Sequence, residues 1–151
     1  MMYVPDPALA LREIRRVLKP SGRVAVLVWG RRTHCGWAEI FPIVDARVKS
    51  EVCPLFFALG GDGVLEYELA GAGFEAVHVE RLACTLSFPS DDDVFAAVFE
   101  GGPVALAYAR FDAPTRRSAQ ADFLASIQKY RTGSGYEIPG EFVLATGVRA
   151  S

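Results

Sequence analysis

The side chains best suited to chemistry lie in a short segment that follows an apolar run of the sequence. His34 and Cys35 are adjacent, and a histidine beside a cysteine can generate a nucleophilic thiolate. No acidic residue stands at a spacing diagnostic of a group that orients such a histidine, so no catalytic residue is assigned. Trp29, Trp37 and Phe41 could line an apolar pocket, or they could pack in the core. The sequence leaves both interpretations of these aromatic residues open.

A glycine-rich segment at residues 60–63 (GGDG) is a second candidate site. Glycine-rich loops can cradle phosphate groups. This segment has no lysine and lacks the Gly-x-Gly-x-x-Gly frame that follows a strand in nucleotide-binding proteins. We therefore expect a loop in which Asp62 caps a helix over residues 64–70.

The sequence offers little support for a metal site. The acidic run Asp91–Asp93 lacks the spaced oxygen ligands of a calcium loop, and we expect it to stabilise the start of a helix. The cysteines Cys35, Cys53 and Cys84 are odd in number and far apart, which argues against a disulfide framework or a zinc site. We predict no metal, and a reducing, cytoplasmic location.

The elements that must position these residues alternate between helices and strands. Asp6 followed by Pro7 predicts the start of a helix. The apolar run at residues 24–28 predicts a strand with both faces covered. Hydrophobic periodicity predicts strands over residues 23–29, 75–88 and 141–148. We expect one α/β domain over residues 1–151, with these strands in a three-stranded mixed sheet flanked by helices.

The composition is that of an ordinary globular protein, with 51% hydrophobic and 23% charged residues. A net charge of −2 provides no electrostatic reason to expect nucleic acid or an anionic membrane as a partner. No apolar run approaches the roughly 20 residues of a membrane span. The first residues do not have the pattern of a signal peptide.

Three segments together carry a family resemblance: residues 6–23 (DPALALREIRRVLKPSGR), residues 72–74 (AGF) and residues 138–147 (IPGEFVLATG). They resemble the C-terminal half of class I S-adenosylmethionine-dependent methyltransferases, in the type-11, ubiquinone/menaquinone-biosynthesis-like group. The first segment is similar to the helix and turn before that family's fifth strand, although Ser21 stands where glycine is usual. The resemblance implies a partial Rossmann-like methyltransferase fold.

The resemblance also implies S-adenosylmethionine as the cofactor, but the chain has no match to the glycine-rich loop or the ribose-binding acidic residue of the family. Its first residues resemble the loop after the family's fourth strand. The residues placed on the cofactor side by this resemblance are Met2, Tyr3 and Pro5. Those placed on the substrate side are Trp29, His34, Trp37 and Phe41.

The family's fifth strand lies between its fourth strand and an antiparallel seventh strand. By this resemblance, strand 24–28 pairs with strand 141–148 on one edge and has no partner on the other. An exposed apolar edge can template pairing with another chain. We therefore expect a homodimer, or a separate chain that supplies the missing half, at the edge of strand 24–28.

The functional prediction is a methyltransferase-like protein that lacks the donor-binding half and is inactive alone. Catalysis in this family depends on placing the sulfonium methyl group in line with the acceptor, so the loss of the donor site removes most of the mechanism. The alternative is a non-enzymatic dimeric α/β module that binds a small apolar ligand or a partner protein. The sequence does not identify a methyl acceptor.

Overall fold

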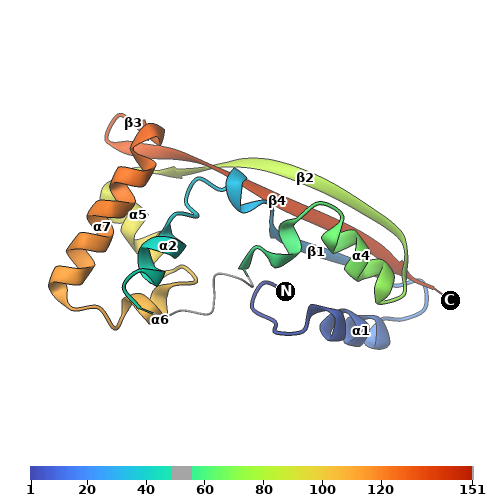
Figure 1. Ribbon diagram of the computed structural model, residues 1–151. Coiled ribbons are helices and arrows are strands. Elements are labelled where there is room, and N and C mark those ends of the chain that lie inside the picture. Colours follow the sequence, from blue (N-terminus) through green and yellow to red (C-terminus); the bar gives the residue numbers. More distant parts are fainter. Residues whose placement is uncertain (49–55, 151) are drawn as a thin grey trace. The chain divides into compact units, whose positions relative to one another are not determined.

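The computed structural model describes residues 1–48 and 56–150, and Figure 1 shows its helices and strands. The chain divides into two compact units. Unit 1 comprises Met1–Arg32, Pro54–Ala83 and Glu141–Ser151, and unit 2 comprises Thr33–Cys53 and Cys84–Gly140. Cys53, one of the three cysteines considered above, lies outside the described residues.

Unit 1 begins with a helix that leads into a strand. Helix α1 spans Pro7–Val17 and strand β1 spans Arg23–Trp29. Asp6 is the N-cap of α1, and its Oδ1 accepts a hydrogen bond from the Leu9 N–H at 2.8 Å. The predicted start of this helix is therefore confirmed, and the cap satisfies one of the N–H groups that lack a partner at a helix start.

Four strands form the sheet, in the order β1-β4-β2, and the short strand β3 pairs with β4. The other strands are β2 (Phe74–Phe88), β3 (Arg131–Thr132) and β4 (Gly135–Arg149). Strands β1 and β4 are antiparallel, with Trp29 opposite Phe142. The three predicted strands and the predicted pairing of strand 24–28 with strand 141–148 are confirmed.

The sheet differs from the prediction in strand number and direction. An additional short strand precedes the predicted strand 141–148, because Arg131–Thr132 pairs with Gly135–Tyr136 in a hairpin. Gly133 has φ +61°, a value that suits a tight hairpin turn and that glycine adopts without strain. The sheet is antiparallel rather than mixed. A parallel pair needs two strands joined by a crossover, and within residues 1–48 and 56–150 the sheet holds no such pair.

The core of unit 1 lies between one face of the sheet and two helices, α1 and α4 (Val64–Gly71). Val26 and Val28 of β1 point to this face and are buried. They lie opposite Ala145 and Val143 of β4, which are also buried. The helices contribute Leu11, Leu65 and Leu69.

Within the residues that the structure describes, the side chains on the other face of β1 are exposed. Ala25 is exposed and Leu27 is 50% exposed, whereas we predicted that both faces of this strand would be buried. The cause is that α1 and α4 both contribute to the one cluster on the opposite face. An apolar run alone does not reveal how many layers of structure cover a strand.

Unit 2 packs short helices around aromatic side chains. Phe99 is fully buried, and its ring lies 4.6 Å from the ring of Tyr108 and 5.7 Å from that of Phe123. The helical elements are α2 (Ile40–Asp45), α5 (Asp91–Phe95), a π-helical turn (Ala96–Glu100), α6 (Ala105–Tyr108) and α7 (Ala113–Ile127).

Side-chain caps begin two of these helices. The Asp93 N–H donates to Ser90 Oγ at 3.2 Å, and Ser90 Oγ donates to the Asp93 carboxylate at 2.6 Å. The acidic run thus lies in the first turn of α5, as predicted. Asp112 caps α7 by accepting from the Thr115 N–H at 2.9 Å.

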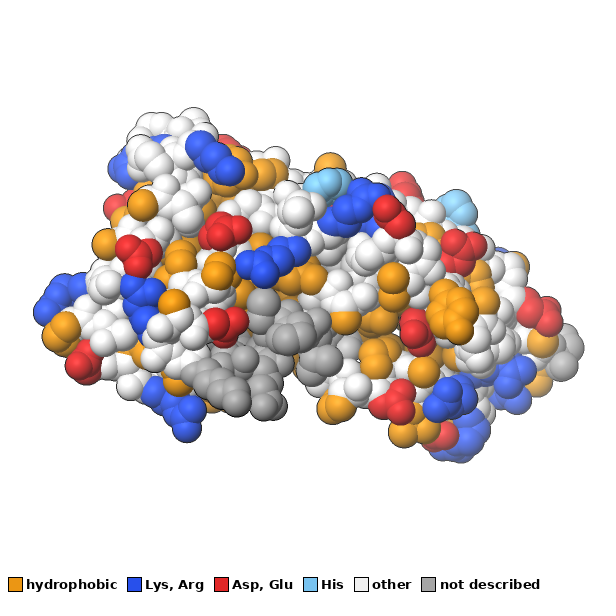
Figure 2. All heavy atoms as spheres, in the orientation of Figure 1, with side chains coloured by type: hydrophobic (Ala, Val, Ile, Leu, Met, Phe, Trp, Pro, Cys, Tyr) orange, Lys and Arg blue, Asp and Glu red, His pale blue; other side chains and the backbone are white. Residues whose placement is uncertain are grey.

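The surface charges and the lengths of the helices bear on two classes of partner, nucleic acids and membranes. Figure 2 shows acidic and basic side chains interspersed over the visible face, with apolar side chains between them. That face has no continuous basic region of the kind that follows a phosphate backbone. No helix within residues 1–48 and 56–150 is both long and apolar enough to cross a membrane.

The one-sided burial of α1 can be tested with two leucines of the same helix. Leu11 is 0% exposed and Leu9 is 51% exposed. We expect Leu11→Ala to lower the free energy of unfolding by about 2–5 kcal/mol, because it removes buried methyl groups and leaves a cavity. Leu9→Ala should change it by no more than about 0.5 kcal/mol. Urea denaturation measures both, and equal losses would contradict the burial of α1.

Candidate functional site

The carboxyl end of β1 brings together four charged side chains from separate segments of unit 1. Arg31 follows β1, and Asp62 lies between the 3₁₀ turn Ala58–Gly60 and α4. Arg81 belongs to β2 and Glu141 to β4. We call Arg31, Asp62, Arg81 and Glu141 the charge cluster.

Glu141 is the most buried member of the charge cluster, at 8% exposure. Its Oε1 accepts from the Arg31 backbone N–H at 2.9 Å and from Arg81 Nη1 at 2.7 Å. Arg81 Nη2 donates to the Gly60 carbonyl at 3.0 Å and lies 2.7 Å from Asp62 Oδ1. A carboxylate can be buried only when it is paired and hydrogen-bonded in this way. The cluster therefore joins the segment after β1 to β2, to β4 and to the loop before α4.

Two glycines make this close packing possible. A Cβ atom on Gly30 would collide with the carboxylate of Glu141. A Cβ atom on Gly60 would collide with the backbone carbonyls of Trp29 and Gly30. Gly30 also donates its N–H to the Glu141 carbonyl at 2.6 Å. Glycine at these positions serves the approach of one backbone segment to another.

Asp62 does not cap α4, which corrects the sequence-based prediction. The N-cap position is Gly63, and no side chain caps it. Asp62 instead pairs with Arg31 and Arg81. The hydrogen bond from Arg31 is the main reason that the pKa of Asp62 lies below its ordinary value of 3.8. The same bond raises the pKa of Arg31.

The structure brings one predicted cofactor-side residue and one predicted substrate-side residue together. The Trp29 N–H donates to Met2 Sδ at 3.4 Å, and the Trp29 ring stacks on Phe142 with centroids 4.1 Å apart. Tyr3 is exposed and meets the Phe56 ring edge-on at 5.6 Å. Pro5 is exposed. The roles assigned to these residues by resemblance stay predictions.

The remaining predicted substrate-side residues belong to unit 2. Trp37 and Phe41 are buried there, with ring centroids 5.9 Å apart. His34 ends the 3₁₀ turn Arg32–His34 and is exposed, whereas Cys35 is buried. Trp37 and Phe41 are thus core residues of unit 2, which is one of the two interpretations that the sequence left open. Their place on a substrate side stays a prediction.

Sequence reasoning missed the charge cluster. Arg81 and Glu141 each lie at a position of their strand where the alternation would place an inward-facing apolar residue, after Val79 in β2 and before Val143 in β4. The sequence contains one sign of the cluster: two opposite charges stand at inward positions of different strands, and a buried charge needs a partner. This sign is weak, because a charged residue at either position could also mark a strand end or a bulge.

The described residues also bear on metal and cofactor binding. Among the described parts of the chain, no group of histidine, cysteine and acidic side chains is arranged to hold a metal ion. The carboxylates of the charge cluster are paired with arginines. Met2 Sδ accepts a hydrogen bond from the Trp29 N–H. The use of S-adenosylmethionine stays a prediction.

Two of three comparisons with known proteins give a match to a methyltransferase or a suspected one. No family model matches the chain. A stretch of 85 residues is 29% identical to methyltransferase ucsB of Acremonium sp.. The stretch covers 56% of this chain and 28% of that protein. The chain is similar to the crystal structure of a suspected methyltransferase from Bacillus halodurans C-125, with a TM-score of 0.51 and 17% identity.

The chain spans only part of both relatives. The structural match covers 97% of this chain and 59% of the Bacillus halodurans chain.

The coupling inside the charge cluster can be measured with a double-mutant cycle. We expect Arg81→Leu and Glu141→Leu each to lower the free energy of unfolding by about 1–3 kcal/mol, because each leaves the other charge without its partner. The double variant should lose about 1 kcal/mol less than the sum. The exposed pair Ser87 and Glu137, joined at 2.8 Å, is the control, with alanine variants that couple by less than about 0.5 kcal/mol. Additive losses for Arg81 and Glu141 would contradict the cluster.

The lowered pKa of Asp62 predicts how its contribution depends on pH. Because the pKa is lower in the folded state than the ordinary value of 3.8, the stabilisation is complete above that value and is lost as the pH falls through the folded pKa. Wild type should therefore melt at a higher temperature than Asp62→Asn at pH 7, and the difference should shrink below pH 3.8. A difference that is independent of pH would show that the charge of Asp62 is not involved.

The sequence match, the fold match and the arrangement of β1, β4 and β2 lead to one conclusion. This chain has a class I methyltransferase-like fold, and part of it is similar in sequence to a methyltransferase.

Proposed function

We propose that this chain is the acceptor-side part of an S-adenosylmethionine-dependent methyltransferase whose donor site is completed by polypeptide outside residues 1–151. One observation carries the proposal: 97% of this chain corresponds to only 59% of a longer methyltransferase-like structure. The curated methyltransferase also extends beyond its match to this chain, because 56% of this chain matches 28% of that protein. Because nearly all of this chain matches one part of a longer structure, the chain is suited to supply one half of a site that further polypeptide completes.

The contacts of Trp29 support a role in holding the acceptor. Trp29 is the last residue of β1 and lies two residues before Arg31 of the charge cluster. Its ring stacks on Phe142 and its backbone meets Met2. This arrangement offers an aromatic surface that suits an apolar or aromatic acceptor.

The charge cluster supports the same role by fixing the end of β1. Arg31, which comes two residues after Trp29, is held through its backbone N–H by Glu141. Glu141 is held in turn by Arg81. Methyl transfer requires that donor and acceptor meet in line, so a surface that positions the acceptor has to be rigid. Arg81 and Glu141 are positioning residues in this proposal, and they do not touch the reacting atoms.

The proposal is tested by comparing the isolated chain with a chimera. In the chimera, this chain replaces the corresponding region of the Bacillus halodurans protein, and the intact parent, shown first to bind S-adenosylhomocysteine, is the control. Calorimetric titration with that ligand should give no saturable heat for the isolated chain. The folded chimera should bind within about tenfold of the affinity of the parent, because it regains a complete donor site.

Two results would contradict the proposal. Saturable binding by the isolated chain would show that residues 1–151 already contain a donor site. A chimera that folds cooperatively but does not bind would show that this chain does not complete the site. Thermal unfolding of each protein, with and without ligand, separates a folding failure from a binding failure.

A further inference from the structure

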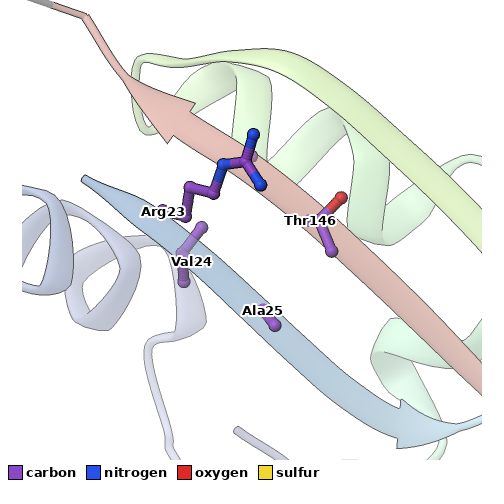
Figure 3. A pocket seen from close by; sticks show the side chains of 5 residues that line it. Arg23, Val24, Ala25 and Thr146 are labelled. Atoms are coloured by element: carbon purple, nitrogen blue, oxygen red, sulfur yellow. The ribbon is translucent and has the colours of Figure 1, made fainter. Parts of the chain in front are cut away.

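Two surface pockets of the described chain differ in the chemistry of their linings. A pocket of 380 Å³ lies on β1 and β4, where Figure 3 shows four of its residues: Arg23, Val24, Ala25 and Thr146. Among the described residues that line it, one is charged and none is aromatic. A second pocket, of 220 Å³, belongs to unit 2 and is lined by Phe99, Glu100, Ala105, Tyr108, Ala109 and Arg116. This unit 2 pocket offers a ligand both charges and apolar surface.

The apolar part of the unit 2 pocket is fixed by the aromatic core of that unit. Phe99 and Tyr108 are 0% and 4% exposed, and their ring centroids lie 4.6 Å apart. Ala105 begins α6 and Ala109 follows its last residue. Residues four positions apart lie on one side of a helix, so the two alanine methyl groups face the same way. Larger side chains at these two positions would fill the pocket.

Arg116 of α7 supplies a positive charge in a fixed orientation. Its guanidinium carbon lies 4.9 Å from the centre of the Tyr108 ring, which is a cation–π contact. Its Nε donates to the Phe111 carbonyl at 3.1 Å, and its Nη2 donates to the Ala109 carbonyl at 3.3 Å. Arginine has five N–H donors, and within the described residues those on Nη1 meet no acceptor. They are available to a ligand.

Glu100 supplies the opposite charge at the same pocket. It is the last residue of the π-helical turn Ala96–Glu100, and it is exposed. Turns of this kind are rare and frequently lie at functional sites. Burial raises the pKa of Tyr108 above its ordinary value of 10.0, and the charge of Glu100 raises it further, while that of Arg116 lowers it. Both charges therefore lie near the Tyr108 hydroxyl.

The two charges of the unit 2 pocket do not neutralise each other directly. No ion pair joins Arg116 to Glu100, and neither has a carboxylate or cationic partner elsewhere in the described chain. A ligand with a single charge would satisfy one of these side chains and face a like charge on the other. A ligand with both charges would satisfy the two together.

We infer that the unit 2 pocket is a binding site for a free amino acid with an apolar side chain. The carboxylate of the ligand accepts hydrogen bonds from Arg116, whose planar donors suit a carboxylate. Its ammonium group donates to Glu100, and its side chain packs against Tyr108 and the two alanines.

The size of the pocket supports a ligand of this class. Its 220 Å³ is below the roughly 300–1,000 Å³ of sites for drug-sized molecules, so it suits one small molecule rather than a peptide or a nucleotide. The site lies within unit 2 and requires no methyl donor. The inference therefore does not rest on the proposed function.

The experiment titrates the full chain, labelled with ¹⁵N, with L-phenylalanine and separately with L-leucine. We expect saturable shifts of the amide signals of Ala105, Ala109 and Arg116. Three further compounds each lack one feature of L-phenylalanine: 3-phenylpropionate lacks the ammonium group, 2-phenylethylamine lacks the carboxylate, and glycine lacks the apolar side chain. Each should bind about tenfold more weakly or worse, because one group of the pocket is left without its partner.

Variants of the lining residues test the location of the site. Glu100→Gln removes the negative charge from an exposed position, and Ala109→Phe fills the pocket from another exposed position. Each should weaken amino-acid binding about tenfold or more. Arg116→Gln should do the same, and if it does not fold, the other two variants carry the test. Arg117→Gln is the matched control, because Arg117 is exposed beside Arg116 and should leave binding as in wild type.

Three results would overturn the inference. The first is the absence of saturable shifts with both amino acids. The second is equal binding of L-phenylalanine and the two singly charged analogues, which would show that the paired charges do not recognise the ligand. The third is wild-type binding by both Glu100→Gln and Ala109→Phe, which would place the ligand elsewhere. Because the titration contains no S-adenosylhomocysteine, its failure and a failure of the chimera are distinguishable.

Discussion

The buried carboxylate of Glu141 holds together the segments that meet at the carboxyl end of β1. It is buried in β4, and it accepts hydrogen bonds from the backbone after β1 and from Arg81 of β2. A charge in that position is stable only while both partners remain in place. Positions 30 and 60 require glycine, because a Cβ atom at either position would disturb this packing.

The same constraint connects the core of unit 1 to the candidate site. One face of β1 buries Val26 and Val28 under α1 and α4, and the next residue along the strand is Trp29. The strand is thus fixed by apolar burial along its length and by the charge cluster at its end. In the proposed function, the aromatic surface at Trp29 lies next to the charge cluster, which agrees with the need for precise positioning in group transfer.

One face and one edge of β1 are exposed for the same reason. Both α1 and α4 pack on one face, and β4 occupies one edge, so the opposite face and the opposite edge have no cover within the described chain. The similar structure from Bacillus halodurans extends well beyond the region that matches this chain.

Local patterns were sufficient for some elements and not for others. Asp6 and Pro7 identified the start of α1, and alternation of apolar residues identified β2 and most of β4, because both signals act between residues that are near in sequence. The hairpin that begins β4 was missed because its two strands are polar and short. Asp62 was assigned to the wrong partner because helix capping is a local rule, while Arg31 and Arg81 approach Asp62 only in the folded chain.

The amino-acid sequence by itself determined the main strands, through their periodicity. The resemblance of three of its segments to a known family implied the methyltransferase-like fold class and the pairing of β1 with β4 on one edge. Only the tertiary structure decided which side chains meet at the end of β1 and that Trp37 and Phe41 pack in the core of unit 2. The physical reason is that ion pairs and buried faces depend on distances between segments far apart in the chain, and no spacing in the sequence encodes those distances.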